Sequence, residues 1–147
     1  MNYKIIKRKV LHCIDLIYKN DSDFFNRSNY EVTISTKLAQ YLFLEFKDYD
    51  VDCEYNKHID TEKIVNKFNS SIRPDILIHK RGTDNNNLVC IEIKKEQNNS
   101  TRTNDYNKLK ELTKQDGQYK YYLGIFIDFY KNKSKTVIIY FRNGIEQ

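Results

Sequence analysis

Apolar and polar positions along the chain predict two helices, a set of strands, a third helix and two final strands. Over residues 3–18 the apolar side chains recur close to helical periodicity, and the polar run 20–23 ends that pattern. A second helical pattern covers residues 30–46. We therefore expect two helices before the first strand.

The rest of the chain alternates between strand-like segments and polar connections. The segments with strand patterns are 50–56, 75–79, 88–95, 121–130 and 135–142. The connection 57–72 is expected to hold a short helix at 62–68, and either Asn104 or Asp105 is suited to cap a helix through Thr113. The polar breaks at 80–87 and 131–134 predict two hairpins.

The first of these hairpins carries the residues of chemical interest. Pro74, the only proline, precedes the first strand, where a missing N–H is tolerated, and Asp75 follows it. Because side chains alternate along a strand, Glu92 and Lys94 share one face of the second strand. The start of one strand meets the end of its antiparallel partner, so Asp75, Glu92 and Lys94 should lie together.

Two carboxylates on otherwise apolar strands are costly without a partner. At about 4 Å and an effective dielectric of roughly 20 they repel by about 4 kcal/mol, so a proton or a cation is expected between them. Lys94 supplies part of that charge, and a divalent metal would supply the rest.

The sequence Pro74-Asp75, a spacer and Glu92-Ile93-Lys94 resembles the PD-(D/E)xK signature of the restriction-endonuclease-like nucleases. The resemblance implies an α/β fold with an αβββαβ core, a mixed central sheet flanked by helices and an extra N-terminal helix. It also implies that Asp75 and Glu92 bind Mg²⁺ (or Mn²⁺) and that Lys94 orients or activates the attacking water. The alternative is a salt-bridged surface hairpin.

A second Glu-x-Lys motif occurs at Glu45-Phe46-Lys47. It lies in a helical pattern, where a two-residue step turns about 200° and separates the two charges. The resembling family often adds an acidic residue on the helix before the sheet, and Glu31 and Glu45 are the candidates. Glu45 lies about 21 Å further along the helix, so only Glu31 is expected to reach the site. The alternative for Glu31 is an ordinary first-turn helix acid.

Three further residues are weaker candidates for the site. Glu54 is a candidate metal ligand, with an edge-strand charge as its alternative. Lys95 and Arg102 flank a polar segment that is expected to be a mobile loop close to the proposed metal, and both are candidates for nucleic-acid binding, with ordinary solvation as the alternative.

Length and composition agree with this interpretation. The 147 residues are expected to form one domain (1–147), with an N-terminal helix in 1–20 and the core in 30–142. A net charge of +5 fits a polyanionic partner. The three cysteines are widely spaced, which indicates no disulfide framework or zinc site. No segment is apolar enough for a membrane span or a signal peptide, so we expect a cytoplasmic protein.

The function expected from sequence is a Mg²⁺-dependent endonuclease that hydrolyses phosphodiester bonds in DNA. With no separate sequence-reading domain visible, it would be non-specific, structure-selective, or targeted by a homodimer or a larger complex. Two alternatives remain open. One is a catalytically silent nucleic-acid-binding subunit, and the other is an RNA nuclease.

Overall fold

The structure is a computed structural model of the chain, and it describes all residues except 27–30, 56, 59–60, 63, 66–69 and 97–100. Three α-helices and two short 3-10 helices are present in this part: α1 (Tyr3–Asn20), η1 (Ser22–Phe25), α2 (Glu31–Glu45), α3 (Thr103–Thr113) and η3 (Lys133–Lys135). The side chain of Asn2 caps α1 by accepting from the Ile5 N–H at 3.0 Å. The two long helices expected before the sheet are confirmed.

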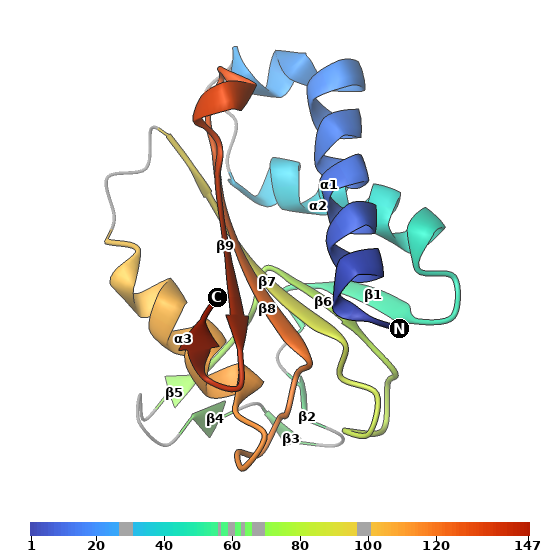
Figure 1. Ribbon diagram of the computed structural model, residues 1–147, viewed down its shortest axis with the longest axis vertical. Helices are drawn as coiled ribbons and strands as arrows, with labels where there is room; N and C mark the ends of the chain where they lie inside the picture. Colours follow the sequence, from blue (N-terminus) through green and yellow to red (C-terminus); the bar gives the residue numbers. More distant parts are fainter. Residues whose placement is uncertain (27–30, 56, 59–60, 63, 66–69, 97–100) are drawn as a thin grey trace.

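One mixed sheet forms the centre of the molecule (Figure 1). Its strands, in spatial order, are β1 (Asp50–Cys53), β6 (Ile76–His79), β7 (Val89–Lys95), β8 (Leu123–Phe129), β9 (Val137–Arg142) and β10 (Ile145–Glu146). Strands β7 and β8 are parallel, and every other neighbouring pair is antiparallel. A parallel pair needs a crossover connection, and α3 lies in the segment that supplies it. The expected mixed α/β architecture and both hairpins are confirmed.

The segment between β1 and β6 differs from the expectation. It contains β2 (Lys57–His58), β3 (Thr61–Glu62), β4 (Ile64–Val65) and β5 (Ser70–Ser71), which form two small two-stranded sheets. The short helix expected at 62–68 is therefore wrong for residues 62, 64 and 65; its other positions lie outside the described residues. The adjacent Ile64 and Val65 are β-branched, and β-branched side chains favour an extended backbone.

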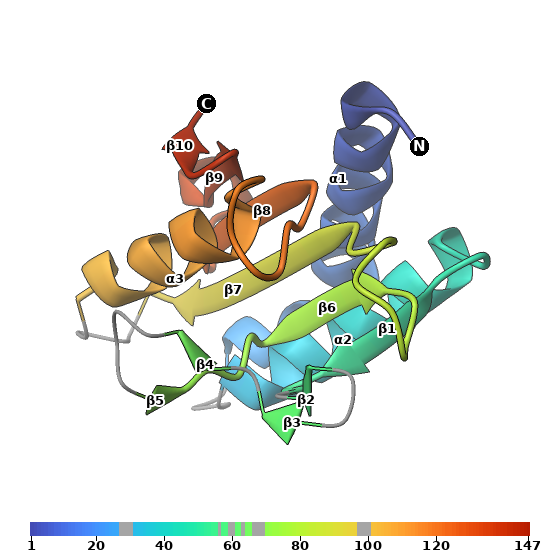
Figure 2. The same ribbon diagram turned by 90° about the horizontal axis from the view of Figure 1, so that it is seen from below.

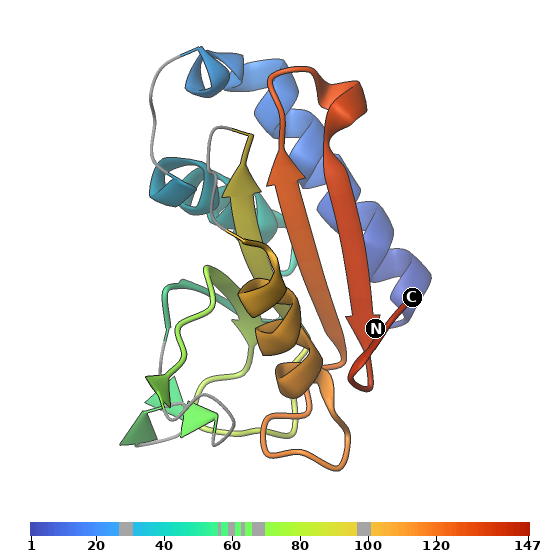
Figure 3. The same ribbon diagram turned by 90° about the vertical axis from the view of Figure 1, so that its left-hand side faces the viewer.

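The helices cover both faces of the sheet (Figure 2). Helices α1 and α2 pack on one face through a core that includes Ile6, Leu38, Ile91 and Ile93. Helix α3 packs on the opposite face, seen in front of the strands in Figure 3. At Gly124 of β8 an added Cβ would lie 3.1 Å from Thr113 Cγ2, so glycine lets α3 approach the sheet closely. The alternation along β7 thus sends its isoleucines to α1 and α2, and Glu92 and Lys94 toward α3.

The cysteines and the helix lengths bear on two further features of the sequence. Cys13, Cys53 and Cys90 are all free thiols. Among the described residues, no helix combines the length and the apolar character that crossing a membrane requires.

Candidate active site

Glu92 is the buried centre of the candidate site. It lies in the middle of β7 with 2% of its surface exposed, and its Oε2 accepts a hydrogen bond from Lys108 Nζ at 2.7 Å. Its other oxygen, Oε1, is buried and has no hydrogen-bond partner among the described residues. Burial, and then the charge of Asp75, raise the pKa of Glu92 well above its usual range, although Lys108 partly offsets them. A proton or a nearby cation is therefore needed to stabilise this buried carboxyl group.

Asp75 lies beside Glu92 because of the register of the hairpin. Ile76 of β6 pairs with Ile91 of β7, so the residue before Ile76 comes level with Glu92. The Ile93 N–H donates to Asp75 Oδ2 at 2.6 Å, which ties the side chain to β7. Burial raises the pKa of Asp75 to about 6, despite the Ile93 N–H and the charges of two nearby lysines. The two carboxylates that the sequence placed together are thus together in the structure.

Lys94 lies between two further carboxylates. Its Nζ is 3.4 Å from Glu31 Oε2 at the start of α2 and 3.4 Å from Asp105 Oδ2 on α3. Burial alone would lower the pKa of Lys94, but the charges of Asp105, Glu31 and Asp75 together raise it. Lys94 is therefore an ammonium at neutral pH, and it can donate hydrogen bonds to an anion but cannot accept a proton.

Helix α3 adds two residues that the sequence analysis did not select. Lys108 Nζ lies 3.0 Å from Asp105 Oδ1, one helical turn away, as well as 2.7 Å from Glu92. Asp105 is 5% exposed, and its Oδ2 has no hydrogen-bond partner in the described part of the chain, although Lys94 pairs with it electrostatically. The available signal was an acid and a base three positions apart on the helix that crosses between β7 and β8. From the sequence Asp105 was a candidate only for the helix N-cap, which is wrong, because α3 begins at Thr103 and Asp105 lies in its first turn.

The cluster as a whole holds more acidic than basic side chains. Its four carboxylates belong to Glu31, Asp75, Glu92 and Asp105, whereas its two ammonium groups belong to Lys94 and Lys108. Full ionisation would leave a net charge of minus two at a largely buried place. Protons, as the raised pKa of Asp75 indicates, or an added cation must compensate for that excess.

The two candidate acids on α2 lie in different places. Glu31, at the first turn, contacts Lys94 as described above. Glu45, at the last turn, has its Oε2 3.7 Å from Lys9 Nζ of α1. The length of the helix therefore separates the two acids, and Glu31 belongs to the cluster.

Glu54 is placed differently from the other acids. Its backbone N–H donates to the Asp75 carbonyl oxygen at 3.1 Å, but its side chain is 49% exposed and lies 4.0 Å from Arg73. Its backbone has a φ of 49° immediately after β1. The contact with Asp75 thus runs through the main chain.

The two candidate nucleic-acid contacts have protein partners. Lys95 is 4% exposed, and its Nζ donates to the Phe24 carbonyl oxygen at 3.3 Å. Arg102 Nη2 lies 2.9 Å from Asp128 Oδ2 of β8, immediately before α3 begins. In this structure both cations join segments of the protein to one another.

The carboxylates of the cluster are the groups that could bind a divalent cation. Within the described ranges, no group of three or more His, Cys, Asp or Glu residues is arranged to hold a metal. Carboxylate oxygens are nevertheless the ligands that Mg²⁺ prefers, and Glu92 offers a buried oxygen without a partner beside Asp75. A divalent cation would neutralise the excess charge of the cluster. Asp75 and Glu92 are therefore the carboxylates from which such an ion would take its protein ligands, and within the described ranges they are two donors rather than a preformed group of three.

Comparisons with known proteins add no family assignment. No protein-family model matches the chain, and no curated protein sequence matches it.

Proposed function

We propose that the protein is a Mg²⁺-dependent (or Mn²⁺-dependent) endonuclease that hydrolyses phosphodiester bonds in DNA. The observation that carries this proposal is the meeting of Asp75, Glu92 and the protonated Lys94 in one buried cluster that has more acidic than basic groups. The order of elements also supports it: α2, β1, β6, β7, α3 and β8 occur in the order of an αβββαβ core of the restriction-endonuclease-like type, with the small strands β2 to β5 inserted between β1 and β6.

The roles follow from the charge of each group. Asp75 and Glu92 would hold the metal ion. The chemistry that such an ion supplies when bound is polarisation of the scissile phosphate and a lower pKa for the attacking water. Lys94, as an ammonium, would hold a phosphate oxygen or the attacking water and stabilise the negative charge that develops there. Glu31 and Asp105 would keep Lys94 charged and in position.

The experiment is nicking of supercoiled plasmid DNA with Mg²⁺ or Mn²⁺, beside EDTA. We expect metal-dependent nicking in the natural protein and its loss in the Asp75→Ala and Lys94→Ala variants. Lys47→Ala, which changes the lysine of the second Glu-x-Lys sequence, is the matched control and should cleave normally. Cleavage by a folded Lys94→Ala variant would contradict the proposed role of this lysine.

Two other results would favour the alternatives. DNA retention without cleavage at any metal concentration would contradict the nuclease proposal and favour a silent nucleic-acid-binding subunit. If the protein cleaved an RNA substrate but left DNA of the same sequence uncleaved, it would be an RNA nuclease.

A further inference from the structure

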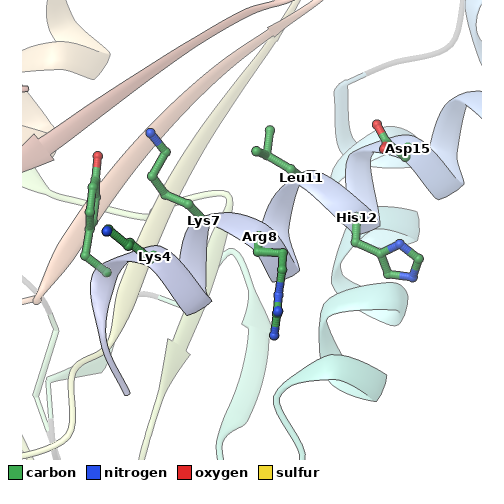
Figure 4. Close-up of a pocket in the computed structure, with 7 residues that line it drawn as sticks. Lys4, Lys7, Arg8, Leu11, His12 and Asp15 are labelled. Carbon is green, nitrogen blue, oxygen red and sulfur yellow. The ribbon is translucent and has the colours of Figure 1, made fainter.

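A second charged region lies on the outer face of α1, on the opposite side of the sheet from α3. A hollow of about 620 Å³ is lined there by residues of α1 that include Tyr3, Lys4, Lys7 and Arg8 (Figure 4). Arg142, at the end of β9, contacts Tyr3 and lines a second hollow of about 360 Å³. These hollows and the residues between them are called the α1–β9 surface below.

Tyrosine rings and cations interleave on the α1–β9 surface. Lys7 Nζ lies 4.0 Å from the ring centroid of Tyr140 and 5.2 Å from that of Tyr3. Arg142 Cζ lies 5.4 Å from the Tyr3 centroid and 4.8 Å from the Tyr122 centroid. Tyr3 and Tyr140 also contact edge to face, with centroids 6.1 Å apart. The faces of half-buried tyrosine rings thus hold Lys7 and Arg142 in fixed positions.

The positive charge of this surface is not neutralised by described carboxylates. Lys4, Lys7, Arg8 and Arg142 form no ion pair within the part of the chain that the structure describes. Asp15 is the one acidic residue among the described residues that line the first hollow, and it pairs with Lys133 at 2.7 Å. Lys7 and Arg142 keep their charge against the rings, and together with the exposed Lys4 and Arg8 they create a positive potential that favours an anionic partner.

We propose that the α1–β9 surface binds the phosphate backbone of a nucleic acid, at a site separate from the acidic cluster. Closely spaced fixed cations match the regular negative charges of a phosphate backbone. If the proposed nuclease function holds, this surface would grip substrate away from the cleavage site. The binding itself rests only on the geometry of the surface.

An anionic membrane is the competing partner, and the packing of α1 argues against it. A helix that binds at a membrane surface inserts an apolar face beside its basic face. In α1 the apolar face, with Ile6, Val10, Ile14 and Ile17, is buried in the protein core. Among the exposed residues of α1, Leu11 is the one large apolar side chain, while Ile5 and Leu16 are partly buried.

The test is fluorescence anisotropy of a labelled DNA duplex, titrated with protein in EDTA at several salt concentrations. EDTA prevents metal-dependent cleavage, so the measurement reports binding alone. The primary variant is Lys7→Gln/Arg142→Gln, and Lys4→Gln/Arg8→Gln is a second variant at exposed positions that should not disturb folding. Lys47→Gln/Lys131→Gln removes the same charge from exposed positions elsewhere and is the matched control.

We expect each α1–β9 variant to bind DNA on the order of tenfold to a hundredfold more weakly at about 0.1 M salt. Each variant lacks two phosphate contacts, and binding therefore releases fewer counterions from the DNA. The slope of log K against log salt should fall by about 1.8 in magnitude, whereas the control should keep the natural slope. An equal loss in variants and control would overturn the proposal, because net charge alone would explain it. Unchanged binding in the folded Lys4→Gln/Arg8→Gln variant would also overturn it.

Two further outcomes separate this proposal from others. Binding to phosphatidylserine vesicles that depends on Lys4 and Arg8, with no such dependence for DNA, would assign the surface to membranes and reject it as a nucleic-acid site. Loss of DNA binding in the variants, with no plasmid nicking by the natural protein, would support the surface and reject the nuclease.

Discussion

Lys108 Nζ lies 2.7 Å from Glu92 Oε2, so a lysine of α3 supplies the nearest positive charge to a buried carboxylate of β7. The same amine lies 3.0 Å from Asp105. Helix α3 therefore does more than connect two parallel strands, because it also brings a counter-charge into the acidic cluster. The contact predicts that the stability of the fold and the electrostatics of the site depend on each other.

Replacing Lys108 by Met keeps most of the length of the side chain and removes its charge. Because breaking a buried ion pair leaves an uncompensated charge, we expect the free energy of unfolding to fall by about 3–5 kcal/mol at pH 7. Urea denaturation in EDTA measures this change. Adding Glu92→Gln to the variant should recover most of the loss.

Lys114→Met is the matched control for Lys108→Met. Lys114, the C-cap residue of α3, pairs with Glu111 of that helix, but its side chain is 43% exposed. We expect no measurable change in its unfolding midpoint. Equal effects of the two substitutions would show that the Glu92 contact has no special role.

The raised pKa of Asp75 predicts a pH dependence of stability. A carboxyl group whose pKa is about 6 in the folded state, against 3.8 ordinarily, binds its proton more tightly when folded. Its contribution therefore favours folding at low pH and is lost as the pH rises from about 4 to about 6. At 1.36 kcal/mol per pKa unit, the loss is about 3 kcal/mol in the absence of metal.

Asp75→Asn isolates this contribution, because the amide oxygen can still accept from the Ile93 N–H. Urea denaturation of both proteins in EDTA at pH 4 and pH 7 should show the variant gaining stability relative to the natural protein as the pH rises. A constant difference between the two proteins would contradict the assignment. Added Mg²⁺ or Mn²⁺ should stabilise only the natural protein, and only above about pH 6.

Glu31 is predicted to control the protonation of Lys94. Its carboxylate raises the pKa of Lys94, so Glu31→Gln should lower that pKa and increase the reaction of Lys94 with acetic anhydride at a fixed pH near 9. Peptide mass spectrometry measures the acetylation of each lysine without relying on nuclease activity. If nicking depends on the Lys94 ammonium, the pH above which nicking activity is lost should be lower in the Glu31→Gln variant than in the natural protein.

Glu45→Gln is the control for Glu31→Gln, because Glu45 lies near Lys9 and belongs to the same helix. It should leave the reactivity of Lys94 unchanged. Lys94 reacting alike in both variants would mean that the 3.4 Å contact with Glu31 has no electrostatic consequence.

Local patterns predicted the principal elements because each buries an apolar face with its own period. The helical spacing of Ile6, Val10 and Ile14 and the alternation of Ile91 with Glu92 are properties of a few neighbouring residues. The short helix expected at 62–68 was wrong for its described residues, which belong to β3 and β4 of the two small sheets. The conformation of that segment depends on pairing with a partner strand. The pattern of apolar and polar residues within one segment carries no information about that pairing.

The candidate site was predictable in the parts that depend on hairpin register and helix length. Asp75 and Glu92 come together because Ile76 pairs with Ile91, and Glu31 reaches Lys94 because it begins α2. Whether Lys95 and Arg102 contact solvent or protein depended on the positions of Phe24 and Asp128, which lie far away along the chain.

The sequence by itself determined the periodic elements, the hairpin and the presence of two carboxylates and a lysine on it, because these follow from spacing within a few residues. Only the tertiary structure decided that α3 returns over β7 and brings Asp105 and Lys108 into the cluster. It also decided that α1 and β9 place Lys7 and Arg142 against the same tyrosine. Both arrangements depend on long-range packing of helices on a sheet, in which residues remote in sequence become electrostatic neighbours.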